Sequence, residues 1–111
     1  MTVKPLLAAL LVLPQLAFAA TVSGKLTSGG GIDNRSITVT LAGGDKIEVY
    51  CPAVCDEKMF VTDKDDVADL RKRYKGKQVV LSYRPEKNNG RLAGPGEDDI
   101  ELFATKLVFV R

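Results

Sequence analysis

Cys51 and Cys55 are the two residues in this sequence whose type and spacing could support redox or metal chemistry. In an oxidising compartment such a pair forms a disulfide by default. The bonded Cα atoms would have to lie roughly 4.4–6.8 Å apart, whereas four extended steps would separate them by about 13 Å. Residues 51–55 must therefore turn, and Pro52 suits the start of a turn. We expect a structural Cys51–Cys55 bridge that stiffens one corner of the fold.

Residues 50–55 also resemble the Cys-Pro-x-x-Cys segment of the exported copper chaperones and thiol reductases associated with cytochrome oxidase assembly. The resemblance implies thiol-redox or copper-handling chemistry at the two sulfurs, with Met59 as a further soft ligand for Cu(I). It covers only this segment, since Asp56 stands where that family has a proline, and the family's distal histidine and longer thioredoxin-like fold are missing. Redox or copper handling is therefore kept as the alternative function.

The sequence lacks the residue patterns that other kinds of catalytic or metal chemistry require. The sequence contains no histidine, which removes Ser-His-Asp and Cys-His catalysis and the commonest zinc ligand. Asp63 and Asp65 are spaced like the first two ligands of an EF-hand loop, but Val67 stands at the third position and no glutamate stands at the twelfth. No carboxylate has the apolar setting that would raise its pKa for acid catalysis. The sequence predicts a non-enzymatic protein with no cofactor and no metal site.

The first nineteen residues have the pattern of a secretory signal peptide. Lys4 supplies the positive start, an apolar run spans residues 6–13, and residues 17–19 read Ala-Phe-Ala, a small-x-small cleavage site. We expect a mature chain over residues 20–111 that is periplasmic or secreted. The apolar run is shorter than the about 20 residues of a spanning helix, so no membrane span is expected after cleavage.

The charge of the expected mature chain is nearly balanced. The whole sequence has 16 basic and 14 acidic side chains, and removal of Lys4 leaves 15 against 14. Nucleic-acid binders usually carry a clear basic excess, so the composition argues against nucleic acid as the partner. The length of the mature chain fits a single domain.

The elements that would position these residues are mainly strands. Polar and apolar residues alternate strictly over 36–41 and 46–50, on either side of a Gly-Gly-Asp break, which predicts a β-hairpin. Its core-facing residues would be Ile37, Val39, Leu41, Ile47 and Val49. A first strand is expected over 21–27, followed by a flexible Ser-Gly-Gly-Gly loop at 28–31. A short extended piece is expected at 58–62.

One helix is expected from Thr62 or Asp63 to about Tyr74, between the third and fourth strands. A Thr or Asp cap and the carboxylates after it favour a helix start, and an apolar stripe recurs at Val67, Leu70 and Tyr74. Further strands are expected over 77–84 and 100–110, the second with a bulge near residues 105–106. The loop between them, 85–99, is long enough to suggest a functional role.

This order of elements resembles the OB-fold, so we expect a mainly β fold: a five-stranded OB-like barrel with one α-helix between strands 3 and 4. OB barrels bind oligonucleotides or oligosaccharides on the face of strands 2 and 3 and on the loops joining strands 1–2 and 4–5. By position these loops would be 28–35 and 85–99. The candidate ligand-binding residues on this face and at these loops are Thr38, Thr40, Lys46, Glu48, Tyr50, Arg84, Lys87 and Arg91.

The function expected from these observations is that of an exported, non-enzymatic binding module of the bacterial cell envelope. Its ligand on the barrel face would be a glycan, an envelope component or a protein partner. A purely structural role in an envelope complex is a further possibility, which would place a contact patch on the outer barrel face and require no small ligand.

Overall fold

The computed structural model describes residues 19–111, so the predicted signal peptide lies outside the described residues except for Ala19. A single-turn 3-10 helix, η2 (Glu57–Met59), precedes the fourth strand. The strands in chain order are β1 (Ala20–Gly31), β2 (Ser36–Thr40), β3 (Lys46–Tyr50), β4 (Phe60–Thr62), β5 (Ala68–Leu70), β6 (Gln78–Lys87) and β7 (Ile100–Phe109).

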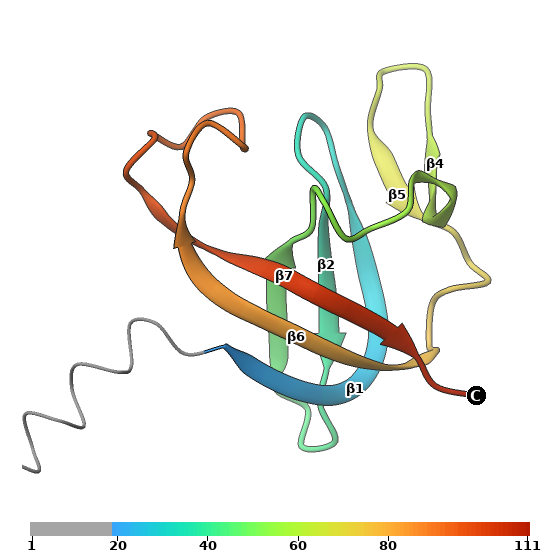
Figure 1. Ribbon diagram of the computed structural model, residues 1–111. Coiled ribbons are helices and arrows are strands. Elements are labelled where there is room, and N and C mark those ends of the chain that lie inside the picture. The colour runs from blue at the N-terminus through green and yellow to red at the C-terminus, as the bar shows by residue number, and fades with distance from the viewer. Residues whose placement is uncertain (1–18) are drawn as a thin grey trace, which may run out of the picture.

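Strand β1 is long and strongly curved, and it closes a five-stranded barrel (Figure 1). Its first half pairs antiparallel with β6 and its second half with β2, and Lys25 pairs with both strands. A bulge follows between Leu26 and Ser28, within the pairing with β2. At the other side, β3 pairs in parallel with β7 at Tyr50 and Phe103. The barrel order is therefore β1-β2-β3-β7-β6-β1, and the short strands β5 and β4 extend the sheet from the end of β1.

The predicted hairpin is confirmed as β2 and β3. Ile37, Val39 and Val49 are fully buried in the core, while Leu41 and Ile47 are partly buried against it. This follows from the period of two, because successive side chains of a strand point to opposite faces. The predicted bulge in the last strand is also confirmed, since Ser82 pairs with Lys106 and Tyr83 pairs with Ala104.

The predicted helix after Thr62 is wrong. Residues 51–77, all of them described, contain no α-helix, and the strands β4 and β5 form a hairpin there. The Asp63 carboxylate accepts hydrogen bonds from the N–H groups of Asp65 and Val67 at 2.8 and 3.0 Å. A side chain that can cap a helix can equally close a turn, and the apolar stripe of three residues was too narrow to decide between them. The chain instead buries alternate residues, Ala68 and Leu70.

The predicted flexible loop at 28–31 is wrong as well, because these residues complete β1. Gly30 pairs with both Ser36 of β2 and Asp69 of β5. Its φ of +136° suits glycine, and a Cβ there would lie 2.1 Å from the carbonyl oxygen of Ala68. The glycines therefore let β1 pass closely between two neighbours. Residues 85–87, predicted as loop, extend β6, which leaves residues 88–99 as the loop.

Candidate functional site

The candidate residues on the outer face of β2 and β3 fall at two ends of that face. Thr40 and Lys46 are cross-strand neighbours at the hairpin end, whereas Tyr50 lies opposite Ser36 at the other end. Between them, Glu48 is exposed but Thr38 is only 9% exposed, so its side chain offers little surface to a ligand. The sequence pattern predicted one site for these residues, but the fold puts Thr40 and Lys46 at one end of the face and Tyr50 at the other.

At the Tyr50 end, side chains from three elements meet around Phe103. The rings of Tyr50 and Phe103 are 6.3 Å apart, and the Arg91 guanidinium lies 3.8 Å from the centre of the Phe103 ring. Arg84 is the cross-strand neighbour of Phe103. Phe103 and Ala104 are both buried although they are consecutive in a strand, which means that both faces of β7 are covered here. The structure thus places three of the candidate residues, Tyr50, Arg84 and Arg91, around Phe103, a residue that the sequence did not single out.

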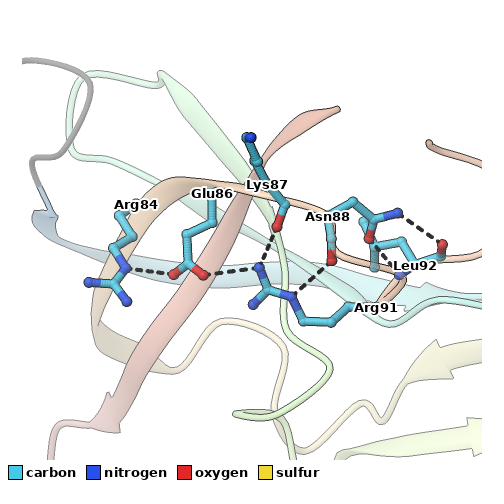
Figure 2. Close-up of polar contacts among 6 residues, drawn as sticks. All are labelled: Arg84, Glu86, Lys87, Asn88, Arg91 and Leu92. Carbon is cyan, nitrogen blue, oxygen red and sulfur yellow. Dashed lines mark hydrogen bonds and ion pairs between the residues drawn. The ribbon is translucent and has the colours of Figure 1, made fainter. Parts of the chain in front are cut away.

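The two arginines at this end are engaged by one carboxylate. Figure 2 shows Arg84 and Arg91 donating hydrogen bonds to opposite oxygens of Glu86. The hydrogen bond from Arg84, followed by that from Arg91, holds the pKa of Glu86 below its ordinary value despite partial burial. Arg91 also donates to the carbonyl oxygens of Lys87 and Asn88 at 2.7 and 3.1 Å. These contacts of Arg91 fix the start of the loop over residues 88–99. Because the Glu86 carboxylate is held in its ionised form, it is poorly suited to act as a general acid.

Asn88 organises the loop over residues 88–99. Its side chain is fully buried, and its amide makes two hydrogen bonds with the backbone of Leu92: Oδ1 accepts from the N–H at 2.7 Å and Nδ2 donates to the carbonyl oxygen (Figure 2). Nδ2 also donates to the carbonyl oxygens of Pro95 and Gly96. In the sequence Asn88 was one of several turn-forming residues, and nothing in their order shows which one would turn inward. Lys87, the remaining candidate in this region, makes an exposed ion pair with Asp98.

The two loops predicted to flank the face are tied together. The side-chain amide of Asn34 makes a pair of hydrogen bonds with the backbone of Ala93: Nδ2 donates to the carbonyl oxygen at 3.0 Å and Oδ1 accepts from the N–H at 2.9 Å. Arg35 fixes the first loop further by donating to the carbonyl oxygens of Gly31 and Ile32. This end of the face is therefore preorganised by contacts within the chain.

A hollow of about 470 Å³ lies at the opposite end, between β1 and the β2–β3 turn. The hydroxyl oxygens of Thr27 and Thr40 are 2.9 Å apart beside it. Gly24 permits the close approach of β1 to β2, since a Cβ there would lie 2.5 Å from the carbonyl oxygen of Thr40. Thr40 is the one candidate residue from the sequence that lines this hollow. Its lining residues are Ser23, Gly24, Lys25, Thr27, Thr40, Leu41, Ala42 and Gln78.

The predicted disulfide is present at the corner after β3. The Cα atoms of Cys51 and Cys55 are 5.4 Å apart, and the carbonyl oxygen of Cys51 accepts hydrogen bonds from the N–H groups of Val54 and Cys55. Cys51 is fully buried, and Met59 is buried in the same core. Reactive cysteines usually occupy partly exposed positions, so the burial of Cys51 favours a structural bridge.

Across residues 19–111, no group of three or more His, Cys, Asp or Glu side chains is arranged to hold a metal ion. In the same part of the chain, no helix has the length and apolar character that crossing a bilayer requires.

Comparisons of the chain with known protein families, with curated proteins and with solved structures find no match.

Proposed function

We propose that this chain is an exported, non-enzymatic binding module of the cell envelope that holds a polar ligand, a glycan in particular, on the outer surface of its barrel. The observation that supports this most directly is the hollow of about 470 Å³ between β1 and the β2–β3 turn. Ligand sites of small molecules commonly occupy clefts of about 300–1,000 Å³.

The chemistry of the lining supports a hydroxyl-rich ligand. Ser23, Thr27 and Thr40 offer hydroxyl groups that both donate and accept, and the amide of Gln78 does the same. Lys25 adds a donor, while Leu41, Ala42 and the carbon atoms of the other lining residues supply apolar surface for the C–H groups of a sugar ring. A lining that combines donors and acceptors with apolar surface matches a sugar ring, which presents both hydroxyl and C–H groups, whereas a wholly apolar compound would leave the polar groups unpaired.

The barrel topology is a second line of support. The strand order β1-β2-β3-β7-β6-β1, with a parallel contact between β3 and β7, is the order we associate with an OB barrel. In this chain the β4–β5 hairpin occupies the place of the expected helix. OB barrels bind oligosaccharides or oligonucleotides on their outer face, and Thr40, at the end of β2, belongs to that face.

Variants of the hollow test the proposal. Thr40→Val keeps the shape of the side chain and removes its hydroxyl, so it should weaken binding of soluble peptidoglycan oligosaccharides, measured by titration calorimetry, by about fivefold for one lost hydrogen bond. Thr21→Val is the matched control, because the Thr21 hydroxyl contacts Ser82 and does not line the hollow. Equal affinities of the two variants, or no binding by the unmodified protein, would reject the proposed ligand site.

The alternative function, thiol-redox or copper chemistry at Cys51 and Cys55, makes a different prediction. If the two sulfurs carried the function, replacement of both cysteines would abolish it while the protein stayed folded. A structural bridge predicts retained glycan binding in the Cys51→Ala, Cys55→Ala variant, because neither cysteine lines the hollow.

A further inference from the structure

The segment between β5 and β6, residues 71–77, concentrates positive charge on one end of the barrel. Its sequence, Arg-Lys-Arg-Tyr-Lys-Gly-Lys, has five basic residues and no acidic one. Lys4 is the one basic residue outside the described chain, which therefore has 15 basic and 14 acidic side chains. Five of the 15 basic side chains lie in residues 71–77, which we call the basic loop, and the rest of the described chain has ten basic and 14 acidic side chains. The net charge of the chain is therefore close to zero, although positive charge is concentrated in this loop.

The cations of the basic loop are exposed, and few of them are neutralised. Among the described residues, one ion pair involves this loop, between Lys75 and Asp69 at 3.7 Å. The Nε of Arg71 donates to the carbonyl oxygen of Lys58, and Arg73 lies 5.0 Å from the centre of the Tyr74 ring. These two contacts orient the side chains without cancelling their charges.

Apolar side chains lie directly beside these cations. The rings of Tyr74 and Phe109 are 5.7 Å apart, and the N–H of Val110 donates to the carbonyl oxygen of Gln78, the residue after the basic loop. Figure 1 shows the end of β7 next to the start of β6 and the segment that leads into it. Val108, Phe109 and Val110 are 42%, 36% and 48% exposed. Phe109 and Val110 thus border the cationic loop, and Val108 lies one residue further back along β7, where it pairs with Val80 of β6.

We propose that the basic loop and the end of β7 form a docking surface for an anionic phospholipid bilayer. Basic side chains are attracted to anionic headgroups, and neighbouring apolar side chains can enter the boundary between headgroups and acyl chains. A single-stranded nucleic acid would use the same cations and stacks on aromatic rings, but the two rings at this surface, Tyr74 and Phe109, pack against each other. The exposed Val108 and Val110 offer nothing to stack on. The surface lies outside the proposed glycan hollow except for its neighbour Gln78, and the inference does not depend on that function.

Vesicle binding tests this inference. The unmodified chain over residues 20–111 should sediment with vesicles of phosphatidylglycerol and phosphatidylcholine, but not with vesicles of phosphatidylcholine alone, and binding should weaken as salt is raised. Lys72→Glu changes the surface by two charges and should weaken this binding by about 30-fold. Lys64→Glu makes the same change in the β4–β5 turn and should leave binding unaltered. Both lysines are exposed, so thermal unfolding should show that both variants fold.

The apolar part has its own variant. Val110→Ser should weaken vesicle binding several-fold and leave binding of a single-stranded oligonucleotide, the competing polyanion, unaffected. Tighter binding to the oligonucleotide than to the vesicles, together with no effect of Val110→Ser, would overturn the proposal in favour of nucleic acid. Absence of vesicle binding, or equal losses in Lys72→Glu and Lys64→Glu, would also overturn it.

Discussion

At the residue scale, the buried amide of Asn88 holds the loop over residues 88–99 through bonds to the backbone of Leu92, Pro95 and Gly96. Asn88→Ala should lower the free energy of unfolding by about 2–3 kcal/mol, because several buried backbone groups would lose their partner. Urea unfolding measures this. Asn89→Gly is the control, since Asn89 has a φ of 50° that glycine adopts easily. A loss in Asn88→Ala no larger than in the control would contradict this role.

Glu86 gives a pH-dependent prediction. Its pKa is lower in the folded chain than its ordinary value of 4.5, chiefly because Arg84 donates a hydrogen bond to it. The stability that it adds is therefore fully present above pH 4.5 and is lost as the pH falls through the lowered pKa. Unfolding free energies of the unmodified chain and of Glu86→Gln should differ most at neutral pH and converge in acid. A difference in unfolding free energy between the two proteins that stays constant from neutral pH to acid would show that the ion pairs of Glu86 do not stabilise the fold.

Residue contacts were the part of the site least accessible from the sequence. The sequence singled out Tyr50, Arg84 and Arg91 by their place in an expected barrel, and the fold gathers these three around Phe103. It did not show that Arg91 would be engaged by Glu86, nor that Thr38 would be buried. Such pairings depend on where a loop folds back, which local periodicity does not encode.

At the element scale, the most demanding position is the crowded end of β1. Gly30→Ala would bring a Cβ within 2.1 Å of the carbonyl oxygen of Ala68 in a backbone conformation that disfavours alanine. We expect a loss of at least about 2 kcal/mol in thermal or urea unfolding. Gly43→Ala is the matched control, because nothing lies within 4 Å of a Cβ at Gly43. Similar stabilities of the two variants would mean that β1 does not pass between β2 and β5 as described.

The disulfide corner gives a second prediction at this scale. The bridge spans few residues, so the chain-entropy estimate for its contribution to stability is only about 2 kcal/mol. Cys51→Ala, Cys55→Ala should therefore unfold at lower urea concentration yet retain the barrel, as far-ultraviolet circular dichroism would show. Complete unfolding of this variant would mean that the bridge holds more of the fold than one corner.

Elements with strict periodicity were predicted well, and ambiguous ones were not. The alternation over residues 36–50 leaves a single consistent structure, and β2 and β3 follow it. Residues 62–74 carried signals that a helix start and a turn share, and the pairing of β5 with the end of β1 decided the outcome. The glycines at 29–31 looked like a linker because glycine tolerates both a loop and a crowded strand.

At the scale of the whole molecule, the closed barrel divides its outer surface into regions of different character. One end has the aromatic and arginine cluster around Phe103, fixed by its own loops, and the opposite side has the polar hollow near the basic loop. The charge balance of the sequence predicted a nearly neutral chain, and its alternating pattern predicted a mainly β module. The run of basic residues at 71–77 is visible in the sequence, but its position beside the apolar end of β7 depends on which segments the topology places side by side.

The hollow between β1 and the β2–β3 turn is the site that we propose holds the ligand. Nuclear magnetic resonance of the ¹⁵N-labelled chain, titrated with soluble peptidoglycan oligosaccharides, tests this proposal because every backbone amide reports. We expect shifts concentrated at residues 23–27, 40–42 and 78. Shifts concentrated instead around Tyr50 and Phe103, or no shifts at all, would contradict it.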